Sequence, residues 1–188
     1  MREAEYRDWL TSHYERVWQN KAQSRRWEKG PIAQISSLFT VLEFRPGVSR
    51  AMWTSATCCM SSPDDEVPIE LHLFSPVQSD LHTELLTAVA HYHRTGAKLG
   101  LGHTVNFGRP WLPDSLCTFG LISLPYIDGP KLEWLPLDSA DHCARLLWLV
   151  PITEAEVAFK KAHGVEALEE RLEAAHFDYI DPQRASVV

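Results

Sequence analysis

The amino-acid sequence predicts an α+β fold, with a central, mostly antiparallel or mixed sheet flanked by helices. Several segments alternate apolar with polar residues or form short apolar runs, which is typical of strands. Other segments repeat apolar residues every three or four positions, the period of an amphipathic helix. Two strand-like segments are joined by Arg45-Pro46-Gly47, as in a hairpin. This mixture of elements, each with one apolar face to bury, indicates the α+β class.

The N-terminal segment is predicted to form an amphipathic helix over residues 3–19. The polar, basic segment that follows ends in Gly30-Pro31 and is predicted to be a connector. We therefore divide the chain into an N-terminal helical extension, residues 1–35, and a domain body, residues 36–188. The apolar stripe of the helix is formed by Tyr6, Leu10, Tyr14, Val17 and Trp18.

The first half of the domain body predicts a hairpin, a third strand and a long helix. Residues 37–44 and 49–60 are the hairpin strands. Residues 69–74 carry aliphatic side chains at alternate positions, as in a half-buried strand. A helix should follow, because Ser79 or Asp80 can cap its first turn. Its apolar stripe is formed by Leu81, Leu85, Ala88, Val89 and Tyr92.

The second half of the body predicts further strands and a capped helix. Residues 146–151 are mostly aliphatic and predict a strand buried on both faces. A helix starts directly after it, because Thr153 and Glu156 have the spacing of a capping box, and Gly164 ends it. This junction therefore has a structural role, and we expect no active site there. Short strands are expected at residues 103–107, 117–124 and 132–137.

The composition is that of one soluble domain with an N-terminal extension. The chain has 188 residues, of which 45% are hydrophobic, enough for one core. It is charged from its second residue onward and lacks the run of about twenty apolar residues that a membrane span requires. We therefore expect a cytoplasmic protein. The four cysteines show no C-x-x-C spacing, and we expect them to be reduced core residues.

The charge of the chain is unevenly distributed. A total of 18 Lys and Arg against 25 Asp and Glu gives a formal charge of −7, the wrong sign for a nucleic-acid or anionic-membrane binder. Residues 1–50 hold nine basic and six acidic residues, net +3, which leaves nine and nineteen, net −10, for residues 51–188. An acidic body suits a basic protein partner, although an ordinary solvated surface can show the same asymmetry.

The sequence contains no recognisable arrangement of catalytic or metal-binding residues. His91 and His93 lie two positions apart on the predicted helix and point to different faces, and no H-E-x-x-H pair exists. No G-x-S-x-G elbow or phosphate-binding glycine loop is found at the strand–helix junction. Asp64, Asp65 and Glu66 lie in a Pro-flanked loop without the burial that tunes a pKa. We therefore expect no enzyme activity, metal or cofactor.

Seven motifs follow one another from residue 57 to the end of the chain. They are "TCCMS", "PIELHLF", "LHTELLTAVAHYHRTG", "LGHTVNFGRPW", "FGLISLP", "LLWLVPITEAEVAFKKAHGVEALEERL" and "DPQRASVV". Their order and spacing resemble the suppressor of fused (SUFU-like) domain family, as a bacterial single-domain member, over about two thirds of the chain. Family members commonly have glycine where this chain has Cys59, and Trp-Pro where it has Gln78-Ser79. The resemblance implies that residues 36–188 form a SUFU-like domain.

The resemblance implies a function in protein binding and not in catalysis. The animal protein of the family sequesters a transcription factor, and bacterial single-domain forms are similar to immunity proteins found beside polymorphic toxins. We therefore expect an immunity protein, or antitoxin, that neutralises a toxin by direct binding. A nuclease toxin fits best, because nuclease surfaces are basic. Two alternatives remain open: a regulatory or scaffold protein that sequesters another client, and a hydrolase or metal enzyme with an unrecognised site.

The partner-binding residues are expected in loops that the core does not obviously need. Acidic side chains there would steer a basic partner, and the indoles of Trp111 and Trp134 would anchor it. Packing in the core is the favoured alternative for both indoles. We expect neither nucleic acid nor a membrane as a partner, and the sequence indicates no oligomeric state. The steering residues are Asp64, Asp65, Glu66, Asp138 and Asp141.

Overall fold

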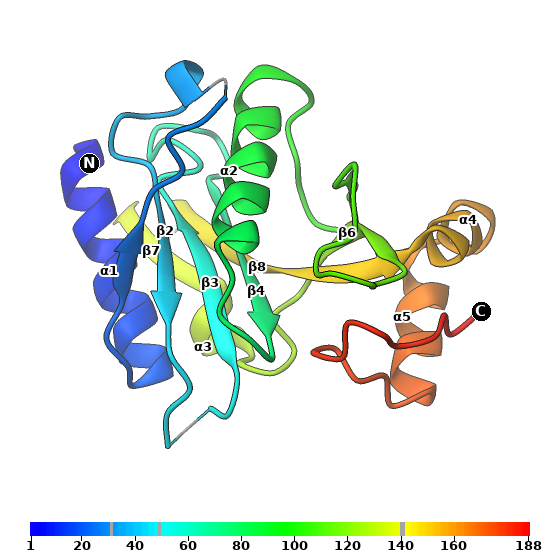
Figure 1. Cartoon of the computed structure of the whole chain (residues 1–188). Coiled ribbons are helices and arrows are strands. Elements are labelled where there is room, and N and C mark those ends of the chain that lie inside the picture. The colour runs from blue at the N-terminus through cyan, green and yellow to red at the C-terminus, as the bar shows by residue number, and fades with distance from the viewer. Residues whose placement is uncertain (31, 49, 140–141) are drawn as a thin grey trace.

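The computed structural model describes residues 1–30, 32–48, 50–139 and 142–188, and it shows an eight-stranded mixed sheet with helices on both faces (Figure 1). The predicted α+β fold is confirmed. The strands are β1 (Gln23–Arg25), β2 (Thr40–Phe44), β3 (Trp53–Cys58), β4 (Ile69–Ser75), β5 (Thr104–Asn106), β6 (Cys117–Ser123), β7 (Trp134–Ser139) and β8 (His142–Thr153). The helices are α1 (Glu3–Trp18), the 3-10 helix η1 (Ile32–Gln34), α2 (Asp80–Thr95), α3 (Pro130–Glu133), α4 (Glu154–His163) and α5 (Val165–Ala174). No helix among the described residues is long and apolar enough to cross a membrane.

The long strand β8 organises the sheet, whose order is β1-β2-β3-β4-β8-β6-β5. One edge of β8 pairs in parallel with β4, from Arg145 opposite Ile69 to Trp148 opposite His72. Its other edge pairs antiparallel first with β7 and then with β6. The expected hairpin is also present, since β2 and β3 pair antiparallel. The mixed character of the sheet therefore comes from the β4–β8 pair.

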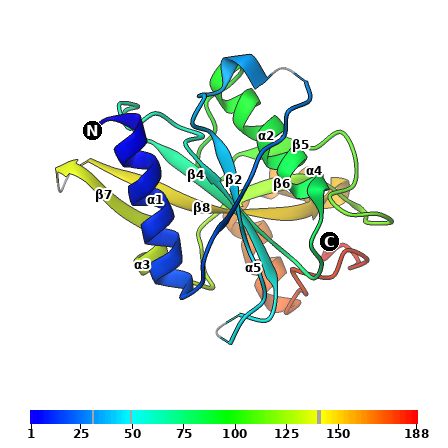
Figure 2. The ribbon, with the colours of Figure 1, turned by 60° about the vertical axis from the view of Figure 1, so that its left-hand side comes forward.

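Three apolar clusters surround the sheet. Helix α2 packs Leu86 and Val89 onto one face, against β4 and the middle of β8. Helix α1 covers the opposite face, where Tyr6 and Tyr14 lie in a cluster with residues of β2, β3 and β7 (Figure 2). Farther along β8, α4, α5 and the C-terminal segment bury Trp148. In Figure 1, α1 lies at the left end of the molecule, and α4 and α5 lie at the right end.

The N-terminal segment is part of the sheet as well as of the core. The segment predicted as a connector contains β1, which pairs antiparallel with β2, so that prediction was incomplete. The prediction of a half-buried strand at residues 69–74 was wrong, because α1 covers the second face of β4. Tyr6 of α1 donates a hydrogen bond to Glu70 over 3.2 Å, and the rings of Trp18 and His72 lie 5.7 Å apart. The division of the chain at residue 35 stays a prediction.

Local sequence signals explain where the later elements begin. The capping box before α4 is confirmed: the backbone N–H of Glu156 donates to the Thr153 hydroxyl, and the backbone N–H of Thr153 donates to the Glu156 carboxylate. Pro130 begins the short helix α3, because proline suits the first turn of a helix. The strand predicted at residues 132–137 therefore begins at Trp134, after α3 has ended.

Candidate functional site

The acidic loop between β3 and β4 contains one carboxylate with an internal role and two that face solvent. Asp65 accepts hydrogen bonds from the backbone of Ser62 over 2.9 Å and from Arg94 of α2 over 2.7 Å. The ammonium of Lys98 lies 3.5 Å from the same carboxylate. These cationic neighbours and the backbone donor outweigh burial and hold the pKa of Asp65 below its usual value. Asp64 and Glu66 are exposed.

The β7–β8 hairpin brings a further carboxylate to the same end of the molecule. Asp138 is exposed and accepts a hydrogen bond from the Met1 amine over 2.7 Å, which raises the pKa of that amine. The ring of His142 donates to the backbone carbonyl of Asp65 over 3.2 Å, so the hairpin contacts the acidic loop. Figure 2 shows the N-terminus of α1 beside this hairpin. Asp141 lies outside the described residues.

Predicted partner-binding residues from two separate loops therefore lie at the same end of the molecule. We call Asp64, Glu66 and Asp138 the acidic end of the molecule. The sequence predicts that these residues lie in surface loops. The sheet brings the loops together, because β8 begins after the hairpin turn, β4 begins after the acidic loop, and the two strands pair in parallel. Parallel neighbours start at the same edge of a sheet, so the segments before them meet there.

The two tryptophans proposed as anchors differ in exposure. Trp111 is 1% exposed, lies in the core cluster under α2 and stacks on His82 at 5.7 Å, so the core-packing alternative is confirmed for this indole. Trp134 at the start of β7 is 45% exposed, and the guanidinium of Arg145 lies 4.8 Å from its ring centre. Of the two indoles, the one of Trp134 is available to a partner.

A further exposed indole, that of Trp9, was not predicted from the sequence. Its side chain is 48% exposed, and its ring N–H donates to the carbonyl of Pro136 in β7 over 3.0 Å. Trp9 falls outside the apolar stripe of α1, and a large aromatic residue on the polar face of a helix is a signal that could have found it. Trp134 in β7 and Trp9, which bonds to β7, therefore both contribute exposed aromatic surface to this part of the molecule.

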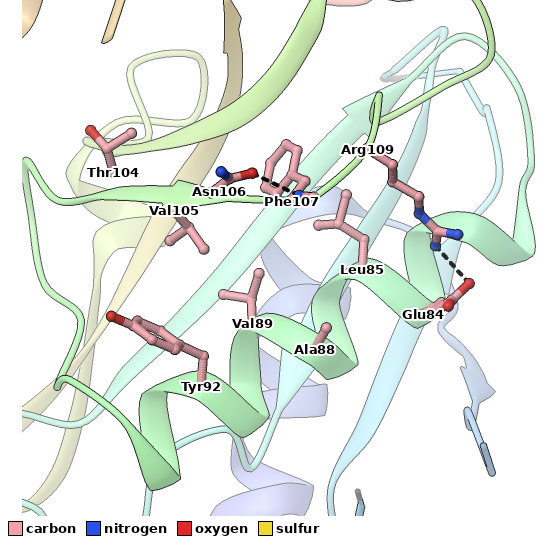
Figure 3. A pocket seen from close by; sticks show the side chains of 11 residues that line it. Glu84, Leu85, Ala88, Val89, Tyr92, Thr104, Val105, Asn106, Phe107 and Arg109 are labelled. Atoms are coloured by element: carbon pink, nitrogen blue, oxygen red, sulfur yellow. Dashed lines mark hydrogen bonds and ion pairs between the residues drawn. The ribbon is translucent and has the colours of Figure 1, made fainter. Parts of the chain in front are cut away.

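A separate apolar groove of about 570 Å³ lies between α2 and β5 (Figure 3). The side chains of Val89 and Val105 face one another across it, and Tyr92 lies at one end. Glu84 and Arg109, the charged residues that line it, pair with each other over 2.6 Å. Two residues of the predicted apolar stripe, Ala88 and Tyr92, are exposed here instead of buried. The groove suits an apolar contact, and it offers no catalytic pair.

The histidines serve mainly as packing groups and hydrogen-bond partners. Burial lowers the pKa of both His82 and His93 to about 4, so they are neutral at pH 7. His93 accepts a hydrogen bond from the backbone of Leu99 over 3.0 Å. Within the described residues, no three His, Cys, Asp or Glu side chains gather as a metal site would require. All four cysteines are free thiols, and Cys58, Cys59 and Cys117 are buried.

One buried carboxyl, Glu70, ties the acidic loop to the core. It accepts hydrogen bonds from Thr57 and from the backbone N–H groups of Met60 and Ser61. Burial raises its pKa to about 7, although these donors favour the charged form. Cys59 forms the turn that directs the two N–H groups toward Glu70. Its φ of 66° is left-handed, a conformation that favours glycine, and glycine is the residue that the family resemblance leads us to expect at this position.

Comparison with known proteins gives consistent results. The sequence model of the family described as suppressor of fused protein (SUFU) matches residues 39–185. The crystal structure of a protein from Neisseria gonorrhoeae FA 1090, described as a SUFU homologue, is similar at 31% identity and a TM-score of 0.85, with 98% of each chain covered. No curated protein matches.

Two more distant structures share the fold. A chain from the crystal structure of the Sufu–Fu complex is 12% identical, with a TM-score of 0.69 over 97% of this chain and 92% of that one. The Drosophila suppressor of fused structure is 13% identical, with a TM-score of 0.64 over 95% of this chain. This chain spans about half the length of the Drosophila protein, since 50% of that chain is covered.

Proposed function

The chain belongs to the suppressor of fused family, and on this premise we propose that it is a protein-binding domain whose acidic end engages a basic protein partner. A chain of the same fold comes from a complex of Sufu with Fu, which supports protein binding as the general role. The observation that carries the proposal is the meeting of exposed carboxylates from two loops, together with the exposed indoles of Trp134 in β7 and of Trp9, which bonds to β7.

The chemistry of this surface suits rapid capture of a cationic partner. The formal charge of −7 attracts a basic protein over several ångströms before contact, and the exposed carboxylates focus that attraction. Indoles at the centre of an interface supply most of the binding free energy once water is excluded. Asp64, Glu66 and Asp138 would therefore mainly affect the association rate, whereas Trp9 and Trp134 would mainly affect dissociation.

We further propose that the partner is a bacterial toxin domain with nuclease activity, and that this chain is its immunity protein. A nuclease needs a positively charged surface to hold phosphates, and that surface is complementary to the acidic end. A domain that covers it neutralises the toxin by excluding nucleic acid. This mechanism needs no catalytic group in the immunity protein.

The experiment has two steps. The chain is first co-expressed with the product of the neighbouring gene, and protection from toxicity and formation of a complex are measured. Association rates are then recorded across a salt series for the wild type and for the Asp64→Lys/Glu66→Lys variant. We expect association of the variant to be slower by about tenfold at low salt, with the difference fading at high salt as ions screen the charges.

A matched control separates local from overall charge. The Glu28→Lys/Asp80→Lys variant changes the formal charge by the same amount at exposed positions outside the acidic end. An equal loss of rate in both variants would contradict a specific role for the acidic end. If the unmutated chain gives no protection and the neighbouring gene encodes no toxin, the immunity role is wrong, and a regulatory or scaffold role with another client becomes the explanation to test.

A further inference from the structure

A second recessed surface lies beside α5. Figure 1 shows this helix at the end of the molecule away from the N-terminus. The recess has a volume of about 500 Å³, which is within the range of ligand pockets. Aromatic side chains of β8, of the loop after β6 and of the C-terminal segment line it together with four carboxylates of α5. We call it the α5 hollow. The aromatic residues are Tyr126, Trp148, Phe177 and Tyr179, and the carboxylates are Glu166, Glu169, Glu170 and Glu173.

Most of these carboxylates lack an internal partner. Glu169 accepts hydrogen bonds from the hydroxyls of Ser123 and Tyr126. Among the residues that the structure describes, no hydrogen-bond donor or cation pairs with the side chains of Glu166, Glu170 and Glu173. No lysine or arginine lines the α5 hollow. The hollow therefore presents negative charge that the fold itself does not neutralise.

The spacing of the glutamates works against the stability of α5. Glu166 and Glu170 are four residues apart, as are Glu169 and Glu173, so that each pair lies on one face of the helix. Like charges at this spacing destabilise a helix, whereas alternation with lysine would stabilise it. Helix stability alone does not explain this arrangement, but an external cation would.

The aromatic part of the hollow also has an unsatisfied polar group. Trp148 is 4% exposed and lines the hollow, and its indole N–H has no hydrogen-bond partner. Its ring lies 5.3 Å from Tyr179 and 6.3 Å from Phe177, which gives a continuous aromatic surface. A buried donor without an acceptor costs free energy, and the aromatic wall of the hollow therefore contains a polar group that the fold leaves unsatisfied.

The same chain pairs arginine with an aromatic ring and a carboxylate at three places, one of which uses Phe177 of the hollow itself. The guanidinium of Arg50 lies 4.9 Å from the ring of Phe74 and pairs with Asp128. In the same way, Arg145 lies over Trp134 and pairs with Glu133, and Arg184 lies over Phe177 and pairs with Glu156. Planar guanidinium groups stack on rings and pair with carboxylates, which makes this combination specific.

We propose that the α5 hollow binds an arginine side chain of a protein partner. The guanidinium lies against the aromatic surface formed by Trp148, Phe177 and Tyr179 and pairs with the carboxylates of α5. This site is separate from the acidic end, and its test does not depend on the identity of a toxin.

The test is an NMR titration of the full-length, 15N-labelled protein with the peptide acetyl-Gly-Arg-Gly-amide. The indole N–H signal of Trp148 is assigned by its loss in the Trp148→Phe variant. We expect this signal to shift in a saturable manner. The matched peptide with citrulline, which has the same shape without the charge, should not shift it. Replacement of Glu166, Glu170 and Glu173 by Gln should weaken arginine-peptide binding by about tenfold or more.

The control removes the same number of charges at the acidic end, in the variant Asp64→Asn/Glu66→Gln/Asp138→Asn, and should leave peptide binding unchanged. The absence of a saturable shift, equal binding of the citrulline peptide, or full binding by the α5 glutamine variant would each overturn the proposal. A lysine peptide that binds as tightly as the arginine peptide would overturn the assignment to a guanidinium. Retained amide spectra in both triple variants establish that they fold.

Discussion

The acidic end and the α5 hollow both carry several carboxylates, but they differ in how the fold treats them. At the acidic end, Asp138 bonds to the Met1 amine, and beside it Asp65 bonds to Arg94. On α5, by contrast, Glu166, Glu170 and Glu173 line a recess without such partners in the described structure. A run of acidic residues in a sequence therefore does not by itself identify a binding surface. What distinguishes the two regions is the presence of internal cations at one of them.

The largest effect is expected from the residue that fixes the C-terminal segment beside the α5 hollow. Arg184 donates to both carboxylate oxygens of Glu156, over 2.7 and 2.8 Å, and to the carbonyl of Pro151. Replacing Arg184 by Ala leaves a buried carboxylate unpaired and should lower the free energy of unfolding by about 3–5 kcal/mol. Chemical denaturation measures this loss. The exposed neighbour Gln183, replaced by Ala, is the control, and an equal effect of both changes would mean that the ion pair does not hold the segment.

A pH-dependent effect is expected at Glu70, beneath the acidic end. Its pKa in the folded protein is about 7, above the ordinary 4.5, so the folded state binds the proton more tightly than the unfolded state. The stability that Glu70 contributes is therefore fully present below pH 4.5 and is lost as the pH rises through 7. Across this pH range the free energy of unfolding of the wild type should fall by about 3 kcal/mol relative to that of Glu70→Gln, because one pKa unit corresponds to about 1.4 kcal/mol.

Comparing the wild type with the Glu70→Gln variant separates the pH-dependent stability due to Glu70 from that due to the buried histidines. His72, His82 and His93 have pKa values lowered to about 3–4, so their contribution rises with pH up to about 6.5, in the opposite direction. The three histidines are present in both proteins, so their contributions cancel in the difference between the two free energies of unfolding. Urea unfolding at a series of pH values measures it, with Glu28→Gln as the exposed control. A difference that does not change with pH would show that Glu70 has an ordinary pKa.

A smaller effect should separate Asp65 from its neighbours in the acidic loop. Asp65→Ala removes the contacts with Arg94, Lys98 and the Ser62 backbone and should cost about 1–2 kcal/mol of stability. Asp64→Ala removes an exposed carboxylate and should change stability by less than about 0.5 kcal/mol. Thermal unfolding of the two variants side by side is sufficient. Equal losses would remove the distinction between internal and free carboxylates in this loop.

The sequence was sufficient to predict elements whose signals are local. The capping box at Thr153 and the buried strand before it depend on neighbouring residues, and both were found. Strand β1 was missed because its polar side chains give no apolar period, and its pairing with β2 is a contact across the fold. Core packing was the favoured alternative for Trp111, but its place under α2 could not be predicted, because it depends on how that helix packs on the sheet.

The candidate sites divide in the same way. Asp64, Glu66 and Asp138 could be placed on the surface from their loops, but the sequence did not show that Asp65 has partners on α2. The glutamates of α5 were visible in the sequence, yet nothing local indicated the aromatic residues beside them. Trp148 and Tyr179 are 31 positions apart and meet because the C-terminal segment returns across β8. Sites built from distant segments require the fold.

The smallest effect should have the opposite sign. Glu173 is exposed in the last turn of α5, where the helix dipole disfavours an anion, and it lies four residues after Glu169. Glu173→Lys replaces this repulsion by an attraction and should raise the free energy of unfolding by about 0.3–1 kcal/mol. If the α5 hollow binds arginine, the same variant should bind the arginine peptide more weakly. Gain of stability with loss of binding would mark a carboxylate retained for a ligand, whereas Asp65→Ala should show loss of stability with unchanged peptide binding. A Glu173→Lys protein that is less stable than the wild type would show that this carboxylate has an internal role after all, and the contrast between the two regions would fail at that residue.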